Sequence, residues 1–570
     1  MLKFGYFEHW TRPPFKFVDW AKEQGVEFKK IDFTKKGYLN GFDVVLIEQH
    51  GFNDYIENDE DYLHDWVKQG GILLIMAQDY KRWAPFFLPT ECGYNQVIHR
   101  HVETVTCPPY LDEDKSPWKI YMMPWIEEAG RKLFNEPEVI NPEEMIHWYV
   151  KLQNGEEVCS AATCCLLPDK QMEVLGSYMD PAVKDGALIC KCNYGKGMFF
   201  INQLLFPEVY TEKAERCLAF WKKYFKNIIA YCNRFRNGES EEMPPKVKGL
   251  PIKRNYKMAT HVHSLDWYGC DSAPGTINAM MRLKKCDICS ITIKYTAPYG
   301  GKLDIDKYSD DKVLFLQGQE FHPFNWNDKY DSLSHNTYHM LTIGVDNDGF
   351  TTKFTRSLFN DDEVNAYLKE AVKFVHDHNG VICSAHAYGY YFDRNVGYDA
   401  MDEEGMTTLV GSNIERFWLE GGKCALMSTI DLFGFRRFIN NPAFSFIYLE
   451  GKVPNRDNIC EAIRKRHTIA STFYESADIT LGDYLPGDEV TIEELKTLPL
   501  NVKATIERGN IKEIRVYSSD KLIYSKPLDD KTIDLTISLK DYNLSKFVRV
   551  ELSGENEYYA CNSTPFFIKN

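Results

Sequence analysis

Histidines separated by one residue occur three times in the sequence. One pair, His376 and His378, ends a predicted helix, and the other two pairs have the strand spacing of a metal-binding pair. His261 and His263 lie in KMATHVHSLDWYG, and His99 and His101 lie in VIHRHVE. Side chains at positions i and i+2 of a strand point to the same face, so either pair could hold one metal ion. Spacing alone therefore does not separate the two pairs.

Polar residues at predicted strand ends follow the pair in KMATHVHSLDWYG. The predicted strand DKVLFLQGQEFH ends near Glu320, HMLTIGV begins at His339, GVICSAHAYG ends at His386, and KCALMSTIDLFG ends at Asp431. Strands that alternate with helices and end in polar ligands are typical of a β/α barrel with its site at that face. The pair in VIHRHVE lacks such partners, and we interpret it as surface imidazoles.

The histidines and carboxylates of five segments follow one another in the order THVHS, GQEFH, HMLTIGV, SAHAYG and IDLFGF. This order resembles that of the PHP family, which is named for polymerase and histidinol phosphatase. The resemblance covers residues 255–475 and implies a distorted β/α barrel that binds two or three metal ions. The segment EAIRKRHTIASTFYES further resembles the carbaryl-hydrolase-like branch of that family. The implied ligands are His261, His263, Glu320 and Asp431 for one ion, and Glu320, His339 and His386 for its neighbour.

The chain departs from the family pattern where a third metal would bind. Members usually have Thr-Asp-His where this chain has Thr-Ile-Lys, ending at Lys294, and Asp-x-His where it has Asp-Leu-Phe, starting at Asp431. The early loop ligand falls near Tyr268. We therefore expect a binuclear centre with Glu320 as the bridge between ions about 3.5–4 Å apart. Its nitrogen and oxygen ligands suit Zn, Mn or Fe better than Ca or Mg.

Three kinds of charged residue are candidates for supporting roles. The ammonium of Lys294 could replace the absent third cation and steady an anionic substrate, although a lysine extending from a strand end to water explains it equally well. Arg436 and Arg437 could clamp a phosphate or carboxylate, or be solvated loop residues. Glu415, in SNIERFW, is a candidate for supporting the ligands from a strand, with an ordinary strand-end carboxylate as the alternative.

The resemblance favours a metal-dependent hydrolase that activates water against a phosphoester of a small, anionic substrate. The carbaryl-hydrolase-like branch leaves open a carbamate, amide or ester bond on the same metal centre. A third possibility is a non-catalytic protein that binds a ligand or glycan through its aromatic residues, which make up 14% of the chain.

The first 235 residues show a β-α-β rhythm. Apolar runs at 42–50, 72–78 and 195–205 predict strands, and amphipathic runs at 59–71 and 212–232 predict helices. This rhythm predicts a doubly wound, parallel sheet. VKQGGILLI and YGKGMFFINQ resemble the class I glutamine-amidotransferase-like, flavodoxin-like fold. The segment lacks a G-x-C-x-G nucleophile elbow, so we expect it to be non-catalytic.

The rest of the chain divides by composition into a linker, the barrel and a last β-rich region. The polar, Pro-containing stretch 236–254 predicts the linker. From 476 to 570, short alternating runs such as LNVKATIER and FVRVELSG predict an antiparallel β-sandwich. Its last segment, YYACNSTPFFIKN, is expected to be an edge strand. The predicted fold is therefore multidomain α/β.

Charge and cysteine content limit the expected partners and location. The 570 residues include 67 Lys and Arg against 82 Asp and Glu, a net charge of −15, which disfavours nucleic acid and anionic membranes as partners. No signal peptide or membrane-spanning run is evident. The 16 scattered cysteines, including Cys286 and Cys289 of a C-x-x-C run, favour buried thiols in a cytoplasmic protein. A homo-oligomer remains open.

Overall fold

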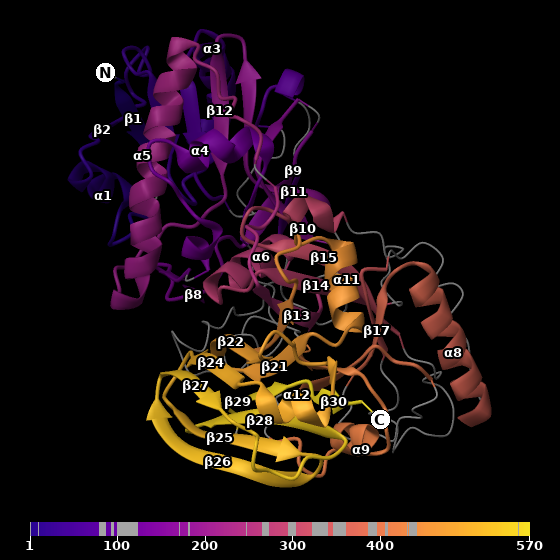
Figure 1. Ribbon diagram of the computed structural model, residues 1–570. Coiled ribbons are helices and arrows are strands. Elements are labelled where there is room, and N and C mark those ends of the chain that lie inside the picture. Colours follow the sequence, from indigo (N-terminus) through magenta and orange to yellow (C-terminus); the bar gives the residue numbers. More distant parts are fainter. Residues whose placement is uncertain are drawn as a thin grey trace. The chain divides into compact units, whose positions relative to one another are not determined.

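The computed structural model contains two compact units, the first formed by Met1–Pro245 and the second by most of the chain from Lys246 to Asn570 (Figure 1). The division lies inside the polar segment 236–254. The residues described are 2–9, 11–78, 87–92, 96–99, 123–146, 148–169, 171–180, 183–246, 248–264, 273–294, 304–321, 340–345, 361–385, 396–404, 408–429, 431, 442–556 and 558–569.

The first unit is built on a ten-stranded sheet that is parallel on one side and antiparallel on the other. Its strands are β1 (Phe4–Phe7), β2 (Phe28–Lys30), β3 (Val44–Ile47), β4 (Ile72–Ile75), β5 (Gln96–His99), β6 (Trp125–Ile126), β9 (Cys164–Leu167), β10 (Glu173–Asp180), β11 (Val183–Tyr194) and β12 (Gly197–Asn202), and a hairpin pairs β7 (Val150–Lys151) with β8 (Glu157–Val158). Its helices include α1 (Phe17–Glu23), α2 (Asp54–Asn58), α3 (Glu60–Lys68), α4 (Arg131–Asn135) and α5 (Glu215–Asn237).

The parallel part of this sheet has the order β2-β1-β3-β4-β12, and β11 and β10 continue it antiparallel. The strands β3 (VVLI) and β4 (ILLI) are buried at every position, as expected of a parallel sheet covered on both faces. The strands and helices predicted from the apolar and amphipathic runs are confirmed as β3, α3, β4, β12 and α5.

The glycine-containing motifs VKQGG and YGKG lie against one another where α3 ends. A Cβ atom at Gly197 would lie 2.0 Å from the carbonyl oxygen of Val67, so only glycine lets β12 approach the end of α3 this closely. The backbone amide of Lys196 donates to the Lys68 carbonyl at 2.9 Å, and that of Met198 donates to the Gly71 carbonyl at 3.1 Å. These bonds fix the helix end against the start of β12.

The chain from Lys246 onward supplies a fifteen-stranded sheet, a separate three-stranded sheet and several helices. The strands of its first half are β13 (Asn255–Val262), β14 (Ile288–Lys294), β15 (Leu314–Phe321), β16 (Met340–Ile343), β17 (Val381–Ser384), β18 (Ala400–Glu404), β19 (Ala425–Thr429), β20 (Ala443–Tyr448) and β21 (Thr468–Thr472). Those of its second half are β22 (Tyr474–Leu481), β23 (Glu489–Val490), β24 (Leu500–Ile506), β25 (Ile511–Ser518), β26 (Lys521–Asp530), β27 (Thr532–Ile537), β28 (Phe547–Gly554), β29 (Ala560–Ser563) and β30 (Phe566–Ile568). The helices include α6 (Pro274–Leu283), α8 (Asp361–Asp377), α9 (Asn413–Leu419), α11 (Arg456–Arg464) and α12 (Ile492–Thr497).

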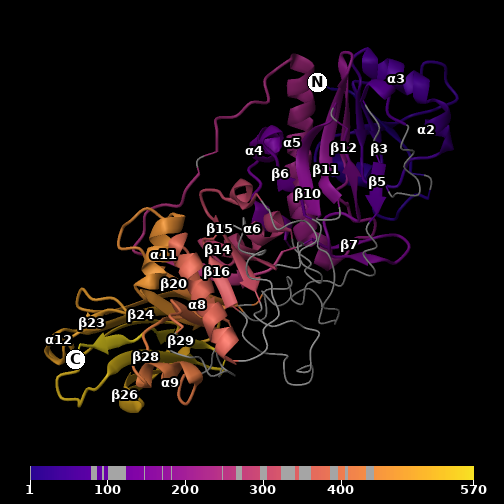
Figure 2. The same ribbon diagram turned by 90° about the vertical axis from the view of Figure 1, so that its right-hand side faces the viewer.

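The large sheet runs β19-β18-β17-β16-β15-β14-β13-β20-β21 and then continues into the last region of the chain. All these strands from β13 to β19 share one direction except β16, which is antiparallel to both β15 and β17. The mixed directions differ from an all-parallel β/α barrel. Helices α8 and α11 lie alongside this sheet (Figure 2).

Side-chain hydroxyls join the two ends of the curled part of the sheet. The hydroxyl of Thr429, the last residue of β19, donates to the carbonyl of Thr260 on β13 at 3.3 Å. The amide of Ser428 donates to the hydroxyl of Ser445 on β20 at 2.9 Å. These four residues are buried, so the contacts bring β19 back beside β13 and β20 in the interior of the fold. The sheet is thereby closed without a backbone ladder between β19 and β13.

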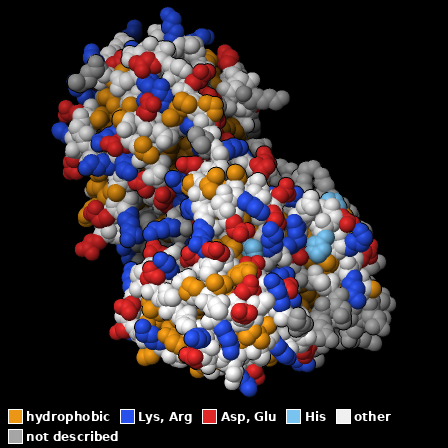
Figure 3. All heavy atoms as spheres, in the orientation of Figure 1, with side chains coloured by type: hydrophobic (Ala, Val, Ile, Leu, Met, Phe, Trp, Pro, Cys, Tyr) orange, Lys and Arg blue, Asp and Glu red, His pale blue; other side chains and the backbone are white. Residues whose placement is uncertain are grey.

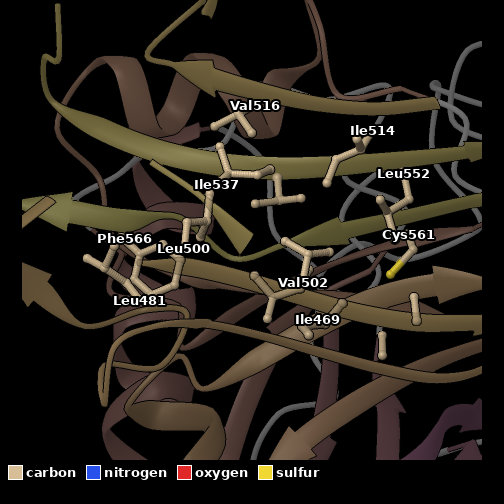
Figure 4. Packing of buried hydrophobic residues seen from close by; sticks show 14 of the residues in the cluster. Ile469, Leu481, Leu500, Val502, Ile514, Val516, Ile537, Leu552, Cys561 and Phe566 are labelled. Atoms are coloured by element: carbon tan, nitrogen blue, oxygen red, sulfur yellow. The ribbon is translucent and has the colours of Figure 1, made fainter. Parts of the chain in front are cut away.

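One hydrophobic core joins the last part of the large sheet to the three-stranded sheet β22-β24-β27. Figure 4 shows Leu481, Val502 and Ile537 of the small sheet packed with Ile514 and Leu552 of the large one. The alternating strands predicted after 476 are confirmed as β24 to β28. The predicted edge strand is wrong, because β29 pairs with both β21 and β28 and links the two halves of the large sheet.

No helix among the described residues has both the length and the apolar character needed to cross a membrane. On the face seen in Figure 3, Lys and Arg side chains are interspersed with Asp and Glu side chains. The described free cysteines are all buried, Cys286 and Cys289 among them, which confirms the interpretation of the C-x-x-C run as core residues. Cys159 is disulfide-bonded.

Candidate metal centre

Four of the predicted ligands come together at one edge of the curled sheet. His261 and His263 lie at the end of β13, Glu320 lies near the end of β15, and Asp431 follows β19. These strands share a direction, so their carboxyl ends meet at the same edge. All four residues are buried, and the exposed fraction of Glu320 is 1%.

The ligand atoms of this group are spaced like the corners of a small polyhedron. Asp431 Oδ1 lies 3.2 Å from His261 Nε2 and 3.3 Å from His263 Nε2. Glu320 Oε1 lies 3.5 Å from His261 Nε2, and Glu320 Oε2 lies 3.3 Å from His263 Nε2. In a tetrahedral site with metal–ligand bonds of about 2.0–2.1 Å, neighbouring ligand atoms are about 3.3–3.4 Å apart. His261, His263 and Asp431 offer ligand atoms that all lie within 4.8 Å of one another, so these three side chains could hold a small divalent cation, and Glu320 lies next to them.

Burial lowers the pKa values of the two histidines and the two carboxylates raise them, and the balance differs between His261 and His263. Burial lowers the pKa of His261 to about 4, which leaves a neutral imidazole that can bind a metal. Burial also acts to lower the pKa of His263, but hydrogen bonds with Asp431 and Glu320 outweigh it and raise this pKa to about 9. Burial acts to raise the pKa of Asp431, yet the two histidines leave it below its ordinary value.

The outer nitrogen of each imidazole faces an acceptor on a neighbouring part of the sheet. His263 Nδ1 lies 3.0 Å from the carbonyl oxygen of Thr292 on β14. His261 Nδ1 lies 3.8 Å from Asp402 Oδ2 on β18. A proton on each Nδ1 leaves the Nε2 lone pairs directed toward the shared centre. Asp402 was not predicted, because it is one of three acidic residues in the strand AMDEE and its residue type does not distinguish it from the other two.

The backbone around the centre departs from a regular strand. His261 has a φ of +56° and Asp431 a φ of +42°, both in the left-handed region that residues with a Cβ rarely adopt. The pairing of β13 with β14 shifts register between Ala259 and Val262. The convergence of His261 and His263 thus depends on this irregularity, and not on simple i, i+2 alternation. Such conformations concentrate at functional sites.

Several other predicted residues lie outside the described residues. These are His339, His386, Arg436 and Arg437. The backbone of Lys294 ends β14 and is paired with Glu320 in the ladder, while its side chain is outside the described part of the chain.

Neighbouring residues show that β16 and β17 reach the same edge of the sheet. Met340, which follows His339 in the sequence, is paired with Phe321 on β15 and with Ser384 on β17. Because β16 runs antiparallel to β15 and β17, its first residue lies at the edge where those two strands end.

The predicted role of Glu415 is wrong. This residue lies in helix α9, not on a strand, and its Oε1 accepts from Nη2 of Arg549 at 2.8 Å. Arg549 also donates to Glu551 at 3.1 Å, so Glu415 belongs to a buried ion-pair network with β28. His376, at the end of α8, pairs with Asp399.

Comparisons with known proteins do not assign a family. No family model and no curated protein matches this chain. The β-galactosidase from Rahnella sp. R3 is 12% identical with a TM-score of 0.24, over 41% of this chain and 31% of that chain. The β-galactosidase from Bacillus circulans sp. alkalophilus is 10% identical with a TM-score of 0.24, over 45% of this chain and 34% of that chain.

A cytoplasmic protein from Salmonella typhimurium is 11% identical with a TM-score of 0.21, over 40% of this chain and 98% of that chain. The chain spans about a third of the length of the two β-galactosidases. TM-scores this low support no assignment of fold or activity.

Proposed function

We propose that the chain is a metal-dependent hydrolase of the PHP type, which uses a binuclear centre to activate water against a phosphoester. The observation that carries the proposal is the convergence of His261, His263 and Asp431, whose ligand atoms lie within 4.8 Å of one another, with the Glu320 carboxylate beside both histidines. This nitrogen and oxygen set suits Zn, Mn or Fe.

In the proposal, Glu320 bridges the two ions. Its Oε1 faces His261 and its Oε2 faces His263, so the carboxylate spans the group. In the proposal, His339 and His386 bind the second ion from the other side of Glu320. Divalent ions held there would lower the pKa of water and polarise the oxygen of the bond to be cleaved.

Three carboxylates around the centre support a role for bound cations. Glu320, Asp402 and Asp431 are all buried, and each can carry a negative charge in a region of low dielectric constant. Buried carboxylates are stable when they are paired or bind metal ions. A divalent ion would offset this charge, and its binding would displace the proton from Nε2 of His263.

The proposal includes a finer assignment of the domains. Residues 1–235 would form a non-catalytic, flavodoxin-like domain of the glutamine-amidotransferase-like class, 255–475 a PHP-type distorted barrel, and 476–570 a β-sandwich. The parallel order β2-β1-β3-β4-β12 supports the first, and the shared core of two sheets supports the last.

Metal analysis of the full chain, purified without chelator, tests the proposal. We expect close to two equivalents of Zn, Mn or Fe, and hydrolysis of nitrophenyl phosphate or a phosphodiester that chelator abolishes. Glu320→Gln should lose both metal and activity. Glu475→Gln, which removes a carboxylate of β22 paired with Lys285, is the control that should retain both.

The substrate screen also includes carbamate and carboxyl esters, because the same centre could act on them. If the protein hydrolysed only those substrates, the metal centre of the proposal would stand and the phosphoester would be replaced by the bond that is cleaved. Trace amounts of transition metal in the purified protein would contradict the proposal as a whole.

A further inference from the structure

Asp402 lies behind one of the two histidines of the candidate centre. Its Oδ2 is 3.8 Å from Nδ1 of His261, on the side of the ring opposite to Asp431 and Glu320. Its side chain is fully buried, with an exposed fraction of 0%. A carboxylate in such a place is costly to bury unless a neighbouring group pairs with it.

Rigid strands, and not a loop, hold Asp402 in place. In the ladder of β18 and β19, Asp402 is paired with Met427, two residues before the end of β19. The end of β19 is in turn joined to β13 by the hydrogen bond between Thr429 and Thr260. Asp402 and His261 are therefore fixed relative to one another through β19.

The oxygen that faces Nδ1 differs in chemical type between the two histidines. Each has Nε2 directed toward the shared carboxylates and Nδ1 directed toward an oxygen. The oxygen behind His263 is a neutral backbone carbonyl at 3.0 Å, and the oxygen behind His261 is a carboxylate at 3.8 Å. A movement of roughly 1 Å would bring the latter pair to hydrogen-bond distance.

We infer that Asp402 is a positioning residue, whose carboxylate holds the Nδ1–H of His261 and thereby directs Nε2 toward the metal position. A carboxylate behind a ligating imidazole fixes its tautomer and orientation and makes it a stronger ligand. The inference rests on the proposed metal centre.

Zinc affinity of the full chain, measured by competition with a chromophoric chelator, tests this role. Asp402→Asn keeps the size of the side chain and an acceptor oxygen but removes the charge, and Asp402→Ala removes both. We expect affinity to fall about 10- to 100-fold in Asp402→Asn and further in Asp402→Ala. The visible spectrum of the Co²⁺-loaded protein should also change, since the orientation of one ligand changes.

Asp399→Asn is the matched control. Asp399 immediately precedes β18 and pairs with His376 at 2.9 Å, away from the candidate ligands. Its loss should lower thermal stability and leave zinc affinity and the Co²⁺ spectrum unchanged. Wild-type affinity and spectrum in Asp402→Asn would overturn the inference alone, whereas failure of the wild-type protein to bind either ion would overturn both it and the proposed function.

Discussion

His261 and Asp431 face one another across the closure of the curled sheet, with Nε2 and Oδ1 3.2 Å apart. They belong to strands that are far apart in the order of the sheet, at β13 and β19. The hydroxyl of Thr429 connects the two, because it donates to the carbonyl of Thr260 and accepts from the amide of Asp431 at 3.2 Å. This side chain therefore helps to fix Asp431 relative to β13.

We expect Thr429→Val to weaken both the fold and the centre. Valine has nearly the same shape but leaves the buried amide of Asp431 and the carbonyl of Thr260 without the hydroxyl, at a cost of about 1–3 kcal/mol in the free energy of unfolding. Urea denaturation measures this cost, and chelator competition measures the lower zinc affinity. Thr468→Val is the control, because its hydroxyl bonds Leu426 at the opposite end of β19. Equal zinc affinity in the two variants would contradict the role given to Thr429.

The two histidine pairs on strands, His261 with His263 and His99 with His101, should differ in metal binding. His263→Ala removes a ligand atom that lies 3.3 Å from both Asp431 and Glu320. We expect zinc to bind at least about 100-fold more weakly, and the increase in melting temperature on adding zinc to disappear. His99→Ala, in strand β5 of the first unit, should keep both. The prediction fails if His99→Ala, and not His263→Ala, loses the zinc-dependent stabilisation.

Residue patterns predicted the elements well and their connections less well. The buried runs VVLI and ILLI and the amphipathic helix before Gly70 record local burial, which is why β3, α3 and β4 were predictable. The burial of a strand does not indicate which other strand pairs with it. The reversed direction of β16 and the insertion of β29 between β21 and β28 depend on such pairing and were not predicted.

The ligands were more predictable than the groups that support them. His261, His263, Glu320 and Asp431 are residue types that bind metals, they lie at predicted strand ends, and the resemblance to the PHP family implied them as a set. Asp402 resembles any acidic residue in the sequence, and only its distance from His261 distinguishes it. The positive φ of His261 is likewise imposed by the bulge and has no sequence signal.

Glu48 makes the stability of the first unit depend on pH. Burial raises the pKa of this carboxyl to about 7, although the amide of His9 donates to it at 2.9 Å. In the unfolded chain the carboxyl has its ordinary pKa of 4.5. Between these values the folded state binds a proton that the unfolded state has lost, so stability falls as pH rises from about 4.5 to about 7.

Glu48→Gln should therefore stabilise the protein at pH 8 and change it little near pH 4.5. The upper limit of the gain is roughly 3 kcal/mol, from the difference between the two pKa values. Urea unfolding at several pH values measures it, with the exposed Glu57→Gln as the control. A gain that is the same at pH 5 and pH 8 would show that protonation of Glu48 is not its cause.

Arg549 stabilises the junction of α9 with β28 through buried charges. Its guanidinium donates to Glu415 at 2.8 Å and to Glu551 at 3.1 Å, and its Cζ lies 4.1 Å from the centre of the Tyr517 ring. Arg549 is fully buried, with an exposed fraction of 0%. Arg549→Met would leave two buried carboxylates without this cation, and we expect a loss of about 3–5 kcal/mol in the free energy of unfolding.

Neutralising one of the two carboxylates should recover part of the stability that Arg549→Met loses. In the double variant Arg549→Met with Glu415→Gln, one of the two carboxylates is neutral, so the double variant should be more stable than Arg549→Met alone. A double-mutant cycle by urea denaturation measures the coupling between the two residues. If the two changes are additive, the ion pair contributes nothing to the junction, and packing of the arginine against Tyr517 accounts for its effect.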